Sequence, residues 1–181
     1  STFSEFKDKI TELQSSGMSK MIIDLRDNPG GVLDEACNMA DMILPEGIIT
    51  YTETKSGKRT DYNSDAESLD IPIVILINEN SASASEVFTG ALKDYGKATV
   101  VGKKSYGKGI VQSVLPFYDG SGMSLTVAKY YTPNGTCIHG IGIEPDVEVD
   151  MPDEYKDMYA SMVEHDKDTQ LQKAIEIIKE K

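Results

Sequence analysis

Apolar and polar positions along this chain follow two spacings, one typical of helices and one typical of strands. Apolar residues at helical spacing predict helices over residues 3 to about 17, 32–44, 86–94 and 168–179. Short, mostly apolar runs predict buried strands over residues 20–25, 71–77 and 98–102. Two further pairs of strands are predicted, residues 47–54 with 58–62 and residues 111–117 with 123–131.

The order of these elements predicts the fold class. Strand–helix units come first and antiparallel strands follow, which indicates an α/β core with a mixed sheet and flanking helices. The 181 residues are enough for one domain, or one and a half, with a substantial core. We expect residues 1–150 to form the core domain. Residues 151–181, an acidic segment and a helix, are expected to pack on that core or extend it.

The net charge and composition of the chain exclude several classes of function. A formal net charge of −12 argues against nucleic-acid binding, which needs a basic face. Residues 144–168 hold ten acidic residues against two lysines, which is typical of a solvated surface, and they contain no calcium-loop pattern. Two histidines are too few for a histidine-based metal cluster, and no apolar run is long enough to span a membrane. We therefore expect no metal ion and no cofactor.

The two cysteines do not make a disulfide framework. Neither Cys37 nor Cys137 has the spacing of a metal-binding pair. Cys37 lies in a helical pattern and is predicted to be a buried free thiol. Whether the two cysteines pair is left open.

The segment Asn80–Glu86 carries three serines on alternate positions between a predicted strand and a predicted helix. A hydroxyl at such a turn suits a nucleophile, because the helix N-terminus offers free N–H groups and a positive dipole end to an oxyanion. The same letters also match a capping box, in which Ser83 caps the helix and Glu86 reaches back to the cap. The spacing alone favours the cap.

Lys108 is the candidate base for a serine nucleophile. A lysine can take a proton only if burial or nearby positive charge lowers its pKa. The flanking Gly107 and Gly109 would let the backbone pack closely and place Lys108 in a dry site. Gln112 could then orient the lysine by a hydrogen bond without adding charge. The alternative is an exposed loop lysine, which is the usual environment of lysine.

The turn Asp27–Gly31 follows a predicted buried strand and precedes a predicted helix. Consecutive glycines there free backbone N–H groups to point at a ligand. An oxyanion hole could combine the N–H of Gly30 or Gly31 with that of Ala84. A tight strand-to-helix turn with no chemical role is the alternative, and this motif alone favours it.

The segment Gly102–Gly109 nearly matches a phosphate-binding loop. Gly109 stands where that loop has the serine or threonine that binds magnesium, and a strand rather than a helix is predicted to follow. Nucleotide binding is therefore disfavoured.

Taken together, these motifs resemble the carboxyl-terminal processing proteases, also called tail-specific proteases. The resemblance runs from about residue 20 to residue 149 and rests on an ordered set of short motifs. They are Ile22–Gly31, Ser81–Glu86, Ala91–Gly96, Val101–Gly102, Tyr106–Gly109 with Val111–Gln112, and Tyr131–Gly135 followed by Gly142–Asp146. The family's usual phenylalanine before Gly-Lys-Gly is Tyr106 in this chain.

The resemblance implies a crotonase/Clp-protease-like α/β core and a serine endopeptidase that cleaves proteins near their C-termini. It implies Ser83 as nucleophile, Lys108 as base and Gln112 as the residue that orients the base. It also implies an oxyanion hole from Ala84 with Gly30 or Gly31. Choosing Ser83 over Ser81 and Ser85 rests on the resemblance, because spacing cannot decide among the three.

The resemblance also implies polypeptide substrates and a location in the cell envelope or outside the cell. Family members usually carry a PDZ domain before the protease core, and no PDZ-like segment is expected within these residues. The oligomeric state is left open. Two other classes remain as alternatives, a non-catalytic peptide-binding or scaffolding protein on the same fold and a crotonase-type acyl-coenzyme A enzyme.

Overall fold

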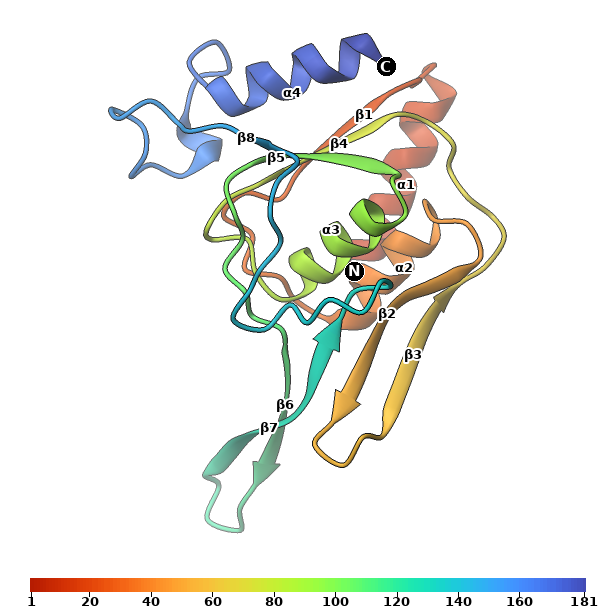
Figure 1. Ribbon diagram of the computed structural model, residues 1–181, viewed down its shortest axis with the longest axis vertical. Coiled ribbons are helices and arrows are strands. Elements are labelled where there is room, and N and C mark those ends of the chain that lie inside the picture. The colour runs from red at the N-terminus through yellow and green to blue at the C-terminus, as the bar shows by residue number, and fades with distance from the viewer.

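Two four-stranded sheets with helices packed around them make up the protein, as a computed structural model describing residues 1–181 shows (Figure 1). The helices are α1 (Thr2–Ser15), α2 (Leu33–Asp41), α3 (Ala84–Asp94), a short 3₁₀ helix η1 (Ala160–Met162) and α4 (Thr169–Glu180). The strands are β1 (Met21–Asp24), β2 (Gly47–Thr54), β3 (Arg59–Ser64), β4 (Ile73–Ile77), β5 (Ala98–Gly102), β6 (Ile110–Pro116), β7 (Gly122–Tyr131) and β8 (Val147–Glu148).

The first sheet is parallel throughout, in the order β1-β4-β5-β8. Its central strand β4 is buried at every position because both faces of the sheet are covered. Ile73, Ile75 and Ile77 point into the main core, which α1, α2 and α3 complete. The alternate residues Val74 and Leu76 face α4 on the opposite side (Figure 1). The continuous apolar run in the sequence thus reflects a strand that is buried on both faces of the sheet.

The second sheet is antiparallel, in the order β3-β2-β7-β6. β7 pairs with β2 only over its last residues, Ala128–Tyr131. Before that point β7 pairs with β6 alone, so that the two strands extend from the body of the molecule as a free ribbon (Figure 1). We call residues 110–127 the β6–β7 ribbon. Most of its apolar side chains are exposed, among them Val114, Leu115, Met123, Leu125 and Val127.

Parallel and antiparallel strands are both present, as the order of the patterns predicted. They are divided between two sheets instead of sharing one mixed sheet. The predicted helices and strands all form, with ends shifted by a few residues. β8 and η1 were not predicted, because elements of two or three residues carry no readable periodicity.

The two cysteines are not bonded to each other. Cys37 is buried, and burial together with the nearby carboxylate of Asp34 raises the pKa of its thiol to about 12. Cys137 is half-buried. No helix has both the length and the apolar character that crossing a bilayer requires.

Candidate active site

Ser83 lies at the N-cap of α3 with a backbone that few residue types adopt. Its φ is 56° and its ψ is −117°. This backbone conformation is unfavourable for any residue that has a Cβ atom. Such a conformation persists only where surrounding contacts enforce it. The side chain is half-buried and forms a capping box with Glu86 at the start of α3.

The neighbouring serines are structural. Ser81 is fully buried, and its hydroxyl donates to the carbonyl of Leu25 at 2.7 Å. The same oxygen accepts the N–H of Asn78 at 3.0 Å, which fixes the turn between β4 and α3. Ser85 is buried within the first turn of α3. These contacts leave Ser83 as the one serine of the three that is not buried.

Glu86 is a fully buried carboxylate that joins two segments, the start of α3 and the loop 105–108. One oxygen, Oε2, accepts the N–H of Ser83 at 2.8 Å and the N–H of Lys108 at 2.8 Å. The other, Oε1, accepts the Ser105 hydroxyl at 2.6 Å and the Gly107 N–H at 2.6 Å. The predicted capping contact from Glu86 therefore exists, but it is one of four bonds. The carboxylate ties the nucleophile's backbone to the backbone of the candidate base.

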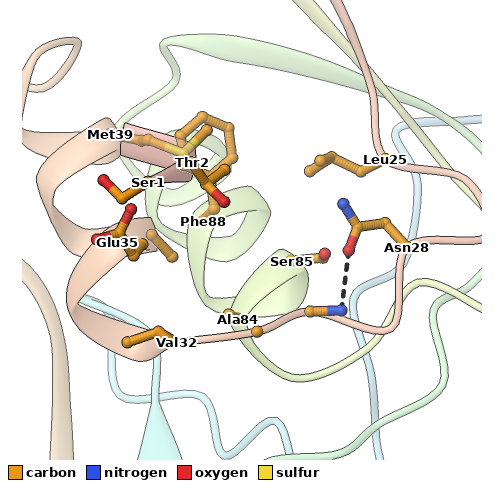
Figure 2. Close-up of a pocket in the computed structure, with 13 residues that line it drawn as sticks. Ser1, Thr2, Leu25, Asn28, Val32, Glu35, Met39, Ala84, Ser85 and Phe88 are labelled. Atoms are coloured by element: carbon orange, nitrogen blue, oxygen red, sulfur yellow. Dashed lines mark hydrogen bonds between the residues drawn. The ribbon is translucent and has the colours of Figure 1, made fainter. Parts of the chain in front are cut away.

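Gly30 packs directly against the start of α3. A Cβ atom on Gly30 would lie 2.5 Å from the carbonyl oxygen of Ala82 and 2.7 Å from the nitrogen of Ala84. Its φ of +88° also favours glycine. The N–H of Gly30 donates to Oδ1 of Asn28 at 2.9 Å, the bond drawn as a dashed line at Asn28 in Figure 2. The N–H of Gly31 has no such partner. The predicted neighbours of the oxyanion hole are thus adjacent in space.

Lys108 has a fixed backbone and an exposed side chain. Gly107 and Gly109 are buried, and Gly109 is so close to the backbone of His139 that no side chain would fit there. The predicted close packing of the glycines is confirmed. The predicted dry site for the lysine side chain is wrong in this structure, because nothing covers it.

Gln112 lies on β6 and is exposed. It pairs with Thr126 of β7, next to a register shift between Val111 and Gln112. Such bulges re-aim side chains near functional sites. No hydrogen bond joins the side chains of Ser83, Lys108 and Gln112. The structure therefore brings together Ser83, Ala84 and the glycine turn, and it ties the backbone of Lys108 to that of Ser83 through Glu86. The side chains of Lys108 and Gln112 make no bond to Ser83.

An apolar pocket of about 460 Å³ opens beside Ala84 (Figure 2). Its wall comes from the glycine turn, the first turns of α2 and α3, and the start of the chain. Its side chains are mostly uncharged, with Glu35 as the exception. The lining residues include Leu25, Val32, Ala36, Met39 and Phe88.

A parallel sheet buried between helices, an attached antiparallel sheet and a serine at a helix start define a Clp-protease/crotonase-like α/β core. Comparison with known proteins gives the family. The model of peptidase family S41 matches residues 1–149, and the chain belongs to that family.

Proteins that are similar in sequence support the assignment to this family. The chain is 49% identical over 156 residues to a probable CtpA-like serine protease of Staphylococcus aureus, covering 83% of this chain and 31% of that protein. The corresponding protein of Staphylococcus epidermidis is 46% identical, with 83% and 32% covered. The chain thus spans about a third of the length of the relatives it matches.

Solved structures show the same fold. The photosystem II D1 C-terminal processing protease superposes with a TM-score of 0.78 at 38% identity, over 83% of this chain and 40% of that one. A putative S41 protease from Bacteroides fragilis gives 0.79 at 20% identity, over 98% of this chain and 49% of that one, which supports the fold alone.

Sequence reasoning missed two roles at this site. The sequence assigns Glu86 only a capping role, although a carboxylate directly before the mostly apolar residues Val87–Leu92 is a signal of a satisfied buried charge. The sequence analysis assigns no separate role to Arg26, yet its guanidinium is buried against carboxylates. The partners of Arg26 lie too far away in sequence for any local pattern to show them.

Proposed function

We propose that this chain is the catalytic part of a serine endopeptidase in which Ser83 is the nucleophile and Lys108 the base. One observation carries the proposal: the buried carboxylate of Glu86 holds the Ser83 N–H and the Lys108 N–H on the same oxygen. The two candidate segments, separated by 24 intervening positions in the sequence, are therefore fixed against each other. The strained backbone of Ser83 supports a functional position.

The oxyanion would be held by two backbone N–H groups. Ala84 N–H, at the start of α3, is one donor and benefits from the helix dipole. Gly31 N–H is the second donor. It is available without any rearrangement, whereas Gly30 N–H already donates to Asn28. Attack by Ser83 Oγ on the scissile carbonyl then gives an acyl-enzyme, which water hydrolyses.

Lys108 must come into contact with Ser83 for this chemistry to proceed. A lysine acts as a base only when its neutral form is favoured, and burial favours that form. A bound polypeptide that covers the site would supply this burial. Gln112, on the strand that follows, is the proposed partner that orients the lysine without adding charge.

The substrate is a polypeptide, and the pocket beside Ala84 suits an apolar side chain next to the scissile bond. Cleavage near protein C-termini is part of the proposal. It rests on the similarity to CtpA-like proteases and to a C-terminal processing protease.

The test uses the longest form of the protein that its gene encodes and an unstructured polypeptide with an apolar C-terminus. Ser83→Ala and Lys108→Ala should each lower kcat/KM by at least about 10³-fold, because both remove a member of the reacting group. Ser81→Ala is the matched serine control. Thermal unfolding of each variant shows whether a loss of activity comes from a loss of folding. Unchanged cleavage in either the Ser83 or the Lys108 variant would refute the assignment.

A fluorophosphonate probe separates the proposal from a non-catalytic scaffold. The proposal expects covalent labelling of the wild-type protein and none of Ser83→Ala. A scaffold would show no labelling in either.

A further inference from the structure

The guanidinium of Arg26, at the end of β1, is buried between two carboxylates. It donates to Asp24 at 2.6 Å and 2.9 Å and to Asp168 at 2.7 Å and 2.9 Å. Only 2% of the side chain of either Arg26 or Asp168 is exposed, whereas Asp24 is 44% exposed. Gln170 adds a contact of 3.1 Å from its Oε1 to the guanidinium. A buried ion pair of this kind fixes the orientation of both side chains, because neither group can replace its partner by a hydrogen bond to water.

Asp27, the next residue, has a backbone φ of 57° and is held by three hydrogen bonds to its carboxylate. Oδ1 accepts the side-chain amides of Asn78 and Asn80, each at 2.9 Å. Oδ2 accepts the N–H of Ala160 at 2.8 Å. Two neighbouring residues of the turn are therefore each held by the C-terminal part of the chain.

The turn passes this restraint to the oxyanion hole. The Asn28 carbonyl accepts the N–H of Ala82 at 3.1 Å, and Gly30 then packs against the nitrogen of Ala84. Only two residues separate Asp27 from Gly30. A shift of the Arg26–Asp27 pair would therefore move the glycine N–H groups relative to Ser83.

We propose that residues 150–181, which lie beyond the family match, position the oxyanion turn through Asp168 and the Ala160 N–H. Asp168 is a positioning residue: it acts through Arg26 and touches no substrate. The inference rests on the proposed function, because it assigns a role in the same acyl-transfer site. It makes the C-terminal segment part of the active-site architecture.

Asp168→Asn is the sharpest variant, because the amide keeps the size of the side chain. Asparagine also retains the cap that Asp168 provides to α4, where it accepts the Leu171 N–H at 2.9 Å. The change removes the negative charge that faces Arg26 and replaces the Oδ2 acceptor of the guanidinium by an NH₂ donor. We expect kcat for the polypeptide substrate to fall about tenfold to hundredfold with KM little changed, since misplaced oxyanion donors weaken transition-state binding alone.

Ala160→Pro tests the second contact by a different route. Ala160 is the first residue of η1, a position that tolerates proline, and Tyr159 before it is extended, with φ −60° and ψ 136°. The variant deletes the one N–H that Asp27 accepts from this segment. We expect a smaller fall in kcat, about threefold to tenfold, again with KM little changed.

Ile178→Ala is the control for stability. Ile178 anchors α4 to the outer face of the parallel sheet, in an apolar cluster that contains none of the turn residues. It should lower Tm at least as much as Asp168→Asn does and leave kcat unchanged when measured well below Tm. If kcat falls equally in Ile178→Ala and Asp168→Asn at matched loss of Tm, the role of Asp168 is only structural and the proposal is overturned.

Normal kcat in both Asp168→Asn and Ala160→Pro would also overturn it. Should Asp168→Asn not fold, Ala160→Pro alone decides. Ser83→Ala, assayed alongside, keeps the two ideas separate. If that variant is inactive while the two C-terminal variants are normal, the proposed function stands and this inference fails.

Discussion

At the scale of single residues, the carboxylate of Glu86 has the most consequence. It accepts four hydrogen bonds with no exposure to solvent, three from residues 105–108 and one from Ser83. Both oxygens of a carboxylate act only as hydrogen-bond acceptors, so all four donors find an acceptor. A neutral amide of the same shape cannot match them.

Glu86→Gln should therefore lower the free energy of unfolding by about 2–3 kcal/mol, because its NH₂ group would face N–H donors and leave one unsatisfied. Urea unfolding measures the change. Glu79→Gln, an exposed glutamate in the preceding turn, is the matched control and should be neutral. Equal urea midpoints for both variants would show that the buried network carries no stability.

At the scale of elements, the turn between β1 and α2 combines strain with charge. Burial alone would raise the pKa of Asp27. Hydrogen bonds from Asn80, Ala160 and Asn78, together with the charge of Arg26, outweigh burial and hold the pKa below its ordinary value of 3.8. The ionised form of Asp27 is thus favoured by folding. Its contribution to stability is complete above pH 3.8 and is lost as the pH falls through the lowered value.

Asp27→Asn should remove that dependence while keeping the positive φ, which asparagine tolerates well. The difference in unfolding free energy between wild type and variant should be largest near neutral pH. It should shrink below about pH 4, where the wild-type carboxyl becomes protonated. Chemical denaturation from about pH 6 down to about pH 2.5 provides the data, and a difference that stays constant with pH would contradict the assignment.

Most elements could be predicted from the sequence, because each depends on a local pattern. The apolar run of β4 and the helical spacing of α1, α2 and α4 are of this kind. The contacts that fix the turn could not be predicted, since Asp168 and Ala160 lie more than 130 positions from Arg26 and Asp27. The dry site predicted for Lys108 failed for a related reason. Flanking glycines govern how a backbone packs, but dryness depends on what covers the side chain.

At the scale of the whole molecule, the parallel sheet is closed on both faces and the antiparallel sheet is not. α4 completes the outer face of the parallel sheet with Ala174 and Ile178, and its cap Asp168 reaches the oxyanion turn. Stability of the sheet and placement of the turn are therefore linked through one helix. The β6–β7 ribbon has no comparable cover within the chain.

The open ribbon makes self-association the main hazard in handling these 181 residues by themselves. Between Gly109 and Ala128 the only charged residue is Asp119, so the overall charge of −12 gives this part of the surface little local protection. The stretch Met123–Ala128 has high β propensity and no proline, and β6 beside it has an unpaired edge. Leu125, on the exposed face of β7, is 46% exposed and is a suitable place for a gatekeeper charge.

Leu125→Lys should shift the isolated chain toward the monomer in sedimentation velocity, at concentrations where the wild-type chain forms larger species, and it should leave Tm nearly unchanged. Lys55→Ala, in the exposed β2–β3 turn away from the ribbon, should not have this effect. A wild-type chain that stays monomeric across that concentration range would mean that the ribbon edge is not adhesive.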